Sequence, residues 1–411
     1  MSTPAEKKRI LAQKVAAINK SFKKTVIASS DKVKNPYFVR RPTGIMELDV
    51  NLAGGFPPGV SMISGPDGVG KSHLLYRTMA MHQRIYGEKA AIAIAAVEAP
   101  LDHFFMRRLG VVIAVPDEVI EEKNDWRKRH GLPGFTKDEI KELKRQVGTF
   151  LDITGATMEQ TLMAIIEILS DPTLRENDNQ FGLIGIDSLN AMIPQALQAT
   201  DLDENAMRAA HATCLTRFFA QYYPLSTSLE GDQLYTTILF TQQVRSNSSK
   251  ASAPPHIAKY LPDFIPAPGA YAAKHGKLID ILLYPGQKKK AAADEEKGGK
   301  KETMQKTLGW EIIKGKAGVH EGVTGEVPFD FGSEDFIDLQ RTILVSGMRQ
   351  GIFSERNGLI TFISPATGLD SEVIKDIPAQ DLIKRMKEDP AFEMEMRHEV
   401  LASHKIECRY I

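Results

Sequence analysis

Short apolar runs alternate with helical segments from about residue 42 onward. Five of these runs are continuous, which is typical of strands buried on both faces of a parallel sheet. They lie at residues 60–64, 90–97, 181–187, 236–243 and 278–284. Residues 158–171, MEQTLMAIIEILSD, have the apolar spacing of a helix that would cross from one strand to the next. The pattern predicts an α/β fold with a mostly parallel central sheet.

The segments on either side of this pattern predict attachments to the core. Residues 5–24 carry apolar side chains at alternating four- and three-residue spacing among lysines. This predicts an amphipathic helix that packs either on its own domain or on a neighbouring subunit. The C-terminal part predicts a small α/β domain, with helices at 334–346 and 371–386 around a short GLITFI strand. We therefore expect an N-terminal helix and linker (1–41), a core (42–332) and a C-terminal domain (333–411).

Three stretches interrupt the regular pattern. Residues 117–148 are charged, helix-prone and split at GLPG, which predicts a helical hairpin on the surface. Residues 246–269 lack periodicity and are rich in Ser, Ala and Pro, and core loops of this length are usually functional or disordered. Residues 286–306 are of low complexity and highly charged, which predicts a solvated hairpin tip.

Composition narrows the class of protein without naming a partner. Lys plus Arg and Asp plus Glu each number 52, so any DNA-binding surface must be a local patch. The two cysteines, Cys214 and Cys408, lack metal-ligand spacing and are expected to be reduced thiols. No apolar run approaches the roughly 20 residues that span a membrane, and the first residues lack the apolar core of a signal peptide. We expect a cytoplasmic protein.

The clearest chemical signal is GPDGVGKS at residues 65–72, which follows a predicted strand and precedes a predicted helix. Two glycines five residues apart, followed by Lys and Ser, form the phosphate-binding loop of nucleoside triphosphatases. Its backbone N–H groups and the helix N-terminus would hold the phosphates, Lys71 would bridge the β- and γ-phosphates, and the Ser72 hydroxyl would hold Mg²⁺. The nucleotide-binding residues expected here are Gly65, Pro66, Asp67, Gly68, Val69, Gly70, Lys71, Ser72 and His73.

Polar side chains at the ends of other predicted strands complete an expected nucleotide site. Asp187 ends the run FGLIGID, where it could orient Mg²⁺ through water. Glu98 follows the run AAIAIAAV and could act as the general base for the attacking water, although a solvent-facing Glu is an equal alternative. Gln242 and Gln243 end a further run, where a side-chain amide could detect the γ-phosphate.

Six stretches in this order resemble the RecA-type homologous recombinases, including the UvsX-like proteins of phages. They are PTGIMELDVNLAGGFPPG, GPDGVGKS, VEAPLDHFFMRRLGV, LIGIDSLNAMIP, FTQQVR and IIKGKAG. The resemblance implies a RecA-like ATPase core that forms a helical filament on single-stranded DNA and pairs it with a homologous duplex. ATP and Mg²⁺ would be bound between subunits, and single-strand-binding or mediator proteins would be possible partners. The divergence suggests a phage or other mobile-element source.

The resemblance also implies roles for individual residues. Glu98 matches the catalytic glutamate, and Gln243 matches the glutamine that links the γ-phosphate to DNA. Asp102 and Phe105 match positions that contact the adenine. Lys314 and Lys316 match a lysine pair that reaches the nucleotide of the adjacent subunit. Residues 195–205 and 246–268 correspond to the two DNA-facing loops, with the candidate DNA-binding residues Arg245, Lys250, Lys259, Tyr260, Phe264 and Gly269.

The sequence departs from the family pattern in the second DNA loop. Where the family usually has a Gly-Gly pair, this chain has APGAY with only Gly269, and the lysine that normally follows aligns with Ala272, near Lys274. The hairpin at 117–148 and the excursion at 286–306 are additional. These departures affect the expected DNA contacts and leave the ATP site unchanged.

Two other functions share the same nucleotide-binding motif. A RecA-fold ring helicase would normally supply an arginine to the neighbouring nucleotide, whereas this chain offers Lys314 and Lys316. A DNA-coating filament protein that uses ATP only structurally is the non-enzymatic alternative, and the altered APGAY stretch keeps it open.

Overall fold

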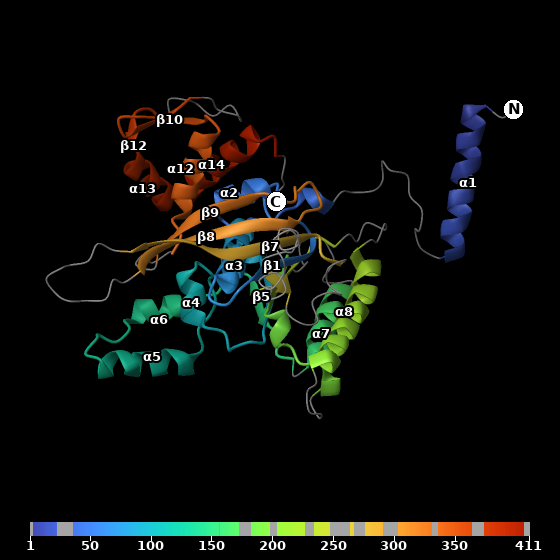
Figure 1. Ribbon diagram of the computed structural model, residues 1–411, viewed down its shortest axis with the longest axis horizontal. Coiled ribbons are helices and arrows are strands. Elements are labelled where there is room, and N and C mark those ends of the chain that lie inside the picture. The colour runs from blue at the N-terminus through green and yellow to red at the C-terminus, as the bar shows by residue number, and fades with distance from the viewer. Residues whose placement is uncertain are drawn as a thin grey trace, which may run out of the picture.

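The computed structural model describes most of the chain as one α/β body with smaller attachments (Figure 1). The described residues are 3–22, 36–155, 157–171, 182–197, 204–226, 234–246, 264–266, 276–290, 303–330, 336–363 and 374–406.

A large sheet forms the centre of the molecule, with strand order β3-β2-β4-β5-β1-β7-β8-β9. Its strands are β1 (Gly59–Gly65), β2 (Ala91–Ala96), β3 (Thr149–Asp152), β4 (Leu183–Asp187), β5 (Thr237–Ser246), β7 (Ile279–Lys290), β8 (Thr303–Lys314) and β9 (Thr324–Asp330). Strands β3 to β7 in this order are parallel, whereas β8 and β9 pair antiparallel. The short strand β6 (Phe264–Pro266) pairs antiparallel with β5. The mostly parallel α/β fold expected from the sequence is therefore confirmed.

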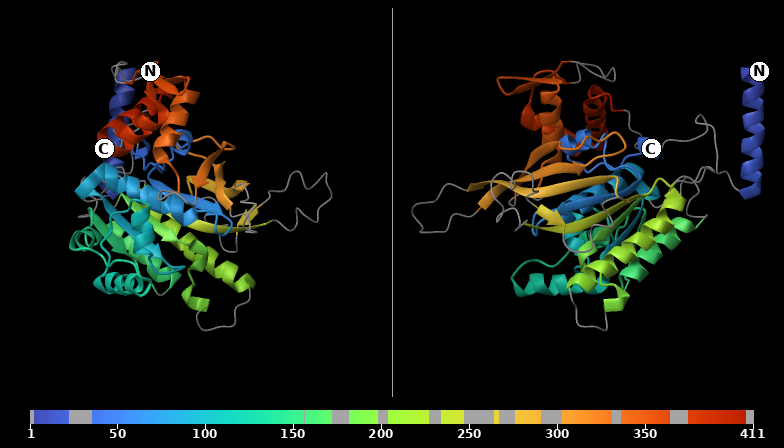
Figure 2. Two further views of the ribbon diagram at one scale, coloured as in Figure 1. Left: turned by 90° about the vertical axis from the view of Figure 1, so that its left-hand side faces the viewer. Right: turned by 45° about the vertical axis from the view of Figure 1, so that its right-hand side comes forward.

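Each face of the sheet is covered by helices because the parallel strands are apolar on both sides. The covering helices are α2 (Met46–Asn51), α3 (Lys71–Tyr86), α7 (Met158–Ser170) and α8 (Glu204–Ser226). Leu74, Leu75 and Met79 of α3 pack on one face with Ile63 and Leu239. On the other face α7 and α8 lie side by side, and their side chains pack with β1, β4 and β5 (Figure 2). Within the described residues, no helix is both long and apolar enough to cross a bilayer.

Three smaller parts extend from this body. Helix α1 (Pro4–Phe22) stands apart from the rest of the protein in Figure 1 and in the right-hand view of Figure 2, with Leu11 and Phe22 largely exposed. A helical hairpin, α5 (Asp117–Arg129) and α6 (Lys137–Leu143), lies beside α4 (His103–Arg108). The C-terminal unit contains α12 (Leu339–Arg349), β10 (Phe353–Arg356), β11 (Leu359–Phe362), β12 (Ile377–Pro378), α13 (Ala379–Glu388) and α14 (Pro390–Ser403).

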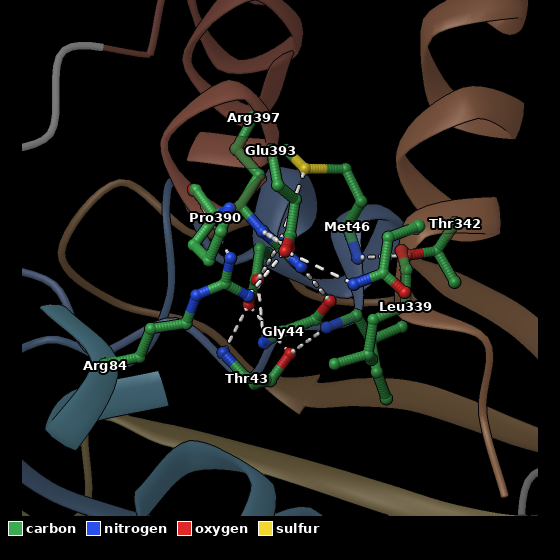
Figure 3. Close-up of polar contacts among 12 residues, drawn as sticks. Thr43, Gly44, Met46, Arg84, Leu339, Thr342, Pro390, Glu393 and Arg397 are labelled. Atoms are coloured by element: carbon green, nitrogen blue, oxygen red, sulfur yellow. Dashed lines mark hydrogen bonds and ion pairs between the residues drawn. The ribbon is translucent and has the colours of Figure 1, made fainter. Parts of the chain in front are cut away.

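The C-terminal unit meets the core through a buried polar network (Figure 3). The Arg397 guanidinium of α14 donates to Glu393 Oε1 at 3.0 Å and to Gly44 O at 2.8 Å, and lies 3.6 Å from Asp49 Oδ2. Glu393 also pairs with Arg84 of α3 at 2.5 Å. This unit has its own apolar cluster, to which Met46 of α2 contributes. The domain limits at 41/42 and 332/333 stay a prediction.

Several expected elements differ in extent from the structure. The helix expected at 371–386 begins only at Ala379. Ile377 belongs instead to strand β12, where it pairs with Ile360 of β11, and Pro378 precedes the first turn of the helix. The stretch 246–269 contains strand β6, so it is not wholly irregular. The hairpin expected at 286–306 has strand-like arms, β7 to Lys290 and β8 from Thr303, and residues 291–302 lie outside the described residues.

Candidate nucleotide-binding site

The loop 65–72 connects the carboxyl end of β1 to the first residues of α3. Gly70 precedes α3 with a φ of 102°, a left-handed conformation that a side chain would strain. A Cβ on Gly65 would lie 2.8 Å from Leu283 O of the neighbouring strand β7. Both glycines of the motif are therefore required by the backbone of this turn, as the motif predicts.

Lys71 lies over the loop that precedes it. Its Nζ donates to Gly65 O at 3.1 Å and to Pro66 O at 2.9 Å, and lies 3.9 Å from Asp67 Oδ1. Burial lowers the pKa of Lys71, against the opposing effect of the Asp67, Glu98 and Asp187 carboxylates. The ammonium group is thus surrounded by oxygen atoms at the place where a phosphate would bind.

Two of these carboxylates come from adjacent parallel strands. Asp187 ends β4, accepts a hydrogen bond from Thr241 Oγ1 at 2.5 Å and lies 3.5 Å from the Tyr76 hydroxyl. Glu98 lies two residues beyond β2, and its backbone N–H donates to Asp187 O at 3.1 Å. The Glu98 side chain is exposed. The sheet therefore brings Lys71, Asp187 and Glu98 to the same edge, as expected for carboxyl ends of parallel strands.

Gln243 connects this edge to the neighbouring strand β5. It pairs in register with Gly65, its backbone N–H donates to Asn190 Oδ1 at 2.8 Å, and its side-chain amide donates to Asp67 Oδ1. Gln242, one residue earlier, is buried with its side chain on the other side of the strand. Gln243 is therefore the one of the two glutamines that contacts the phosphate-binding loop.

The two candidate adenine contacts lie at helix α4. Asp102 caps this helix, since its Oδ1 accepts the Phe105 N–H at 2.9 Å. The Phe105 ring packs 6.1 Å from Tyr76 and 6.5 Å from His73 on α3. Burial lowers the pKa of His73 to about 3, with Arg77 contributing, so this ring is neutral at pH 7. His73 belongs to an aromatic cluster, and the half-buried Phe105 ring packs against that cluster.

The lysine pair lies elsewhere on the sheet. Lys314 ends β8 opposite Asp280, the second residue of β7, and β8 is two strands away from β1. Lys316 lies in the loop after β8, so only Lys314 of the pair belongs to the strand. Burial, followed by the charges of Lys316 and Lys277, lowers the pKa of Lys314. A Cβ on Gly315 would lie 2.4 Å from Val319 O, which explains the glycine between the two lysines.

Most of the predicted DNA-binding residues fall outside the described residues. These are Lys250, Lys259, Tyr260 and Gly269, together with residues 198–203 of the first predicted DNA loop. The backbones of Arg245 and Phe264 are described: β5 pairs with β6 so that Arg245 lies opposite Ile265 and Ser246 opposite Phe264. The second predicted loop therefore leaves and returns at the end of β5, three residues beyond Gln243.

Three polar side chains at this edge were not expected from the sequence. Thr241, Asn190 and Tyr76 bond to Asp187 or to Gln243. Thr241 lies two residues before Gln243, so period-2 alternation could have placed both on one side of β5. Asn190 and Tyr76 had no such signal, because their contacts depend on how the elements pack.

The residues at this edge fit a nucleoside triphosphate with Mg²⁺. The N-terminus of α3 and Lys71 offer positive charge to phosphates, and Ser72 lies in the first turn of α3. The Ser72 hydroxyl and the Asp187 carboxylate are hard oxygen donors of the kind that Mg²⁺ prefers.

Sequence comparison finds relatives among bacterial proteins named RecA. A RecA of Kineococcus radiotolerans is 38% identical over 116 residues, which cover 27% of this chain and 32% of that protein. A RecA of Ruminococcus albus is 36% identical over 110 residues, covering 26% and 27%. A RecA of Leifsonia xyli is 29% identical over 248 residues, covering 60% and 55%.

The matches are partial. The chain spans between about a quarter and just over half of the length of these curated relatives. No protein-family model matches the chain. The finer resemblance to UvsX-like proteins of phages stays a prediction. Together with the α/β fold and the glycine-rich loop at the end of β1, the matches support a relationship between this chain and the RecA-like proteins.

Proposed function

We propose that this protein is an ATP-dependent recombinase that forms helical filaments on single-stranded DNA and catalyses homologous pairing and strand exchange. The relatives named RecA support this proposal, as does the set of side chains at the carboxyl edge of the sheet. Hydrolysis of ATP to ADP and phosphate would be stimulated by DNA.

The observation that carries the proposal is the contact of Gln243 with the phosphate-binding loop. Its amide donates to Asp67 of that loop, while its own strand ends three residues later at Ser246. Ser246 is also the first residue of the second predicted DNA loop, residues 246–268. A bound γ-phosphate would compete for the Gln243 amide, so a change at the nucleotide would be passed along β5 to the DNA-binding segment.

The chemistry assigned to the site uses four side chains. Lys71 and Ser72 would hold the β- and γ-phosphates and Mg²⁺, and Asp187 would orient the metal. When bound, Mg²⁺ would neutralise charge on the phosphates. The exposed Glu98 carboxylate would accept a proton from the attacking water. It lies near enough to Lys71 of the phosphate-binding loop for its charge to oppose the lowering of the Lys71 pKa by burial.

Neighbouring subunits would share the ATP site. Lys314 ends β8, two strands away from β1, and Lys316 follows it in the next loop. Burial, followed by the charge of Lys316, lowers the pKa of Lys314, as expected where cations are gathered to receive an anion. Helix α1 stands apart with exposed apolar side chains, and we assign it to the interface with the next subunit. Lysines supplied by a neighbour would stabilise the transition state only after assembly.

The DNA contact is assigned to the second predicted loop. It contains cationic and aromatic residues of the kind that bind single strands with little base preference, namely Lys250, Lys259, Tyr260 and Phe264, and it is flanked by the other two candidates, Arg245 and Gly269. Affinity for DNA should fall as salt rises, because lysine contacts release counterions from the phosphates.

The decisive experiment combines DNA-stimulated ATP hydrolysis with joint-molecule formation between single-stranded and homologous duplex DNA. Open helical filaments in electron micrographs, together with joint molecules, would support a recombinase. Closed rings would indicate a helicase instead. Filaments without joint molecules would indicate a DNA-coating protein.

Two variants test the nucleotide site within that experiment. Lys71→Ala should lose ATP binding and the active filament. Glu98→Gln should keep ATP binding and filaments but lose turnover, since water is no longer activated. Wild-type hydrolysis by Lys71→Ala would refute the assignment of this loop.

The shared site is tested by mixing variants. A Lys314→Ala, Lys316→Ala double variant should lose DNA-stimulated hydrolysis, and adding Glu98→Gln protein should restore part of it at mixed interfaces. A mixture that co-assembles yet stays as inactive as either parent would contradict a site built from two subunits.

A further inference from the structure

The α5–α6 hairpin is anchored to the helix that follows the phosphate-binding loop. Its two ends meet where the Val147 N–H donates to Val112 O at 3.3 Å. The buried Gln83 amide of α3 bonds to both ends: it accepts from the Val112 N–H at 2.8 Å and donates to Val112 O and Val147 O, each at 3.0 Å. The base of the hairpin therefore has a fixed place relative to α3.

Arg107 of α4 ties that helix to the same hairpin. Its guanidinium donates to Ile113 O at 2.7 Å and to Arg145 O at 3.1 Å, which lie on the two ends of the hairpin. It also donates to Glu142 O at 2.7 Å and contacts Glu142 Oε1 at 3.1 Å. A planar guanidinium with several fixed acceptors allows little rotation or sliding of α4.

Aromatic contacts hold α4 from two sides. Phe104 stacks on Phe135 of the hairpin, with ring centroids 6.2 Å apart and planes 10° apart. The next residue, Phe105, packs on the other side against Tyr76 and His73 of α3. Helix α4 is thus held between the hairpin and the helix that begins at the phosphate-binding loop.

The hairpin also forms part of the wall of a cavity beside the candidate site. The cavity has a volume of about 770 Å³, and its lining includes Glu98, Asp102 and Phe104. Val119 of α5 lines it from the hairpin. The hairpin therefore reaches the segment that carries Glu98, the candidate proton acceptor, and the candidate contacts to the adenine.

We propose that the α5–α6 hairpin is a positioning element for recognition of the nucleotide base, acting through Arg107 and the Phe104–Phe135 stack on α4. This inference rests on the proposed ATP site. The hairpin holds Asp102 and Phe105 where they meet the base of a nucleoside triphosphate. The phosphates are bound by residues 65–72, whose turn is set by its own glycines, so the hairpin contributes to the base half of the ligand alone.

The test compares two ligands, ATP and inorganic tripolyphosphate, each with Mg²⁺, by titration calorimetry without DNA. Phe135→Ala should weaken ATP binding about three- to tenfold and leave tripolyphosphate binding unchanged. Leu132→Ala is the matched control, because Leu132 is an exposed apolar residue of the same hairpin that does not belong to the stack. It should change neither affinity.

A second variant removes the whole element. Because the ends of the hairpin are hydrogen-bonded to each other, residues 114–145 can be replaced by an Asn-Gly turn between Ile113 and Gln146. This variant should bind ATP at least tenfold more weakly than the wild type, with tripolyphosphate affinity within twofold.

The outcomes separate the inference from the function on which it rests. If both variants keep the wild-type preference for ATP over tripolyphosphate, the hairpin does not position the base contacts. If both ligands are lost in parallel, the hairpin serves folding and the proposal is overturned. If the wild-type protein binds neither ligand, the nucleotide site itself is wrong.

Discussion

Two units are attached to the central sheet, and one arginine is central to each attachment. Arg107 holds the α5–α6 hairpin mainly through backbone carbonyls, which are neutral acceptors. Arg397 of the C-terminal unit lies between two buried carboxylates, Asp49 of the core and Glu393 of its own helix. A buried carboxylate without its partner is far more costly than a carbonyl that can turn to water. The two attachments should therefore differ in their response to mutation and to pH, although each is built around a guanidinium group.

The largest effect is expected at the C-terminal attachment. Arg397→Met would leave Asp49 and Glu393 buried without the cation between them, and each is 1% exposed. Such a change should lower the free energy of unfolding by about 3–5 kcal/mol. Urea denaturation followed by circular dichroism would measure it. A loss below about 1 kcal/mol would show that the network adds little to this junction.

The same network explains one of the elements of the fold that were not evident from the sequence. Continuous apolar runs predicted β1, β2, β4, β5 and β7, because those strands are buried on both faces. Helix α14 was missed, since Glu393 and Arg397 occupy positions on its buried side where a periodic pattern would require apolar residues. The edge strand β3 was missed because most of its side chains are exposed.

The candidate site shows a similar division. The spacing of Gly65, Gly70 and Lys71 is visible in the sequence because adjacent residues form the whole turn. Gln83 and Arg107 carry no such signal, because they bond mainly to backbone groups. Backbone groups are the same whatever side chain the partner residue carries. Their partners are defined by tertiary packing alone.

A smaller effect is expected from pH. Burial raises the pKa of Asp49 to about 6, against the opposing charge of Arg397. The ordinary pKa of an Asp carboxyl is about 4. Between that pH and pH 6 the folded protein holds a proton at Asp49 that the unfolded chain has released. The stabilising contribution of this group is therefore complete below about pH 4 and is lost as pH rises through 6.

An Asp49→Asn variant isolates this contribution. The stability of the wild type relative to the variant should fall by on the order of 2–3 kcal/mol between pH 4 and pH 7. Denaturation curves at several pH values measure the difference in free energy of unfolding between the two proteins. Contributions from the titrating groups that both proteins share cancel in this difference. A difference that is flat or rises with pH would contradict the assigned pKa direction.

The hairpin attachment should be less sensitive. Arg107→Met removes hydrogen bonds to three carbonyls and to the half-exposed Glu142, for a loss of about 2 kcal/mol. Hydrogen exchange should show faster exchange in α5 and α6, with α13 and α14 unchanged. Arg129→Met is the control, since Arg129 is an exposed arginine of α5. Equal loss of protection in both attached units would mean that they unfold together.

The smallest effect is expected at a second ion pair of the C-terminal junction, between Arg349 of α12 and Glu47 of α2. Its atoms lie 2.6 Å apart, closer than Arg397 and Asp49, but the Arg349 side chain is 60% exposed. Water solvates both groups when the pair is broken, so Arg349→Met should cost less than about 1 kcal/mol. The cost should shrink further in 1 M salt, where exposed charges are screened within about 3 Å. Denaturation of Arg349→Met and Arg397→Met at low and high salt compares an exposed and a buried arginine across one junction. If Arg349→Met costs as much as Arg397→Met and resists salt, the separation between the charges matters more than burial, and the contrast between the two attachments would have to be explained by distance instead.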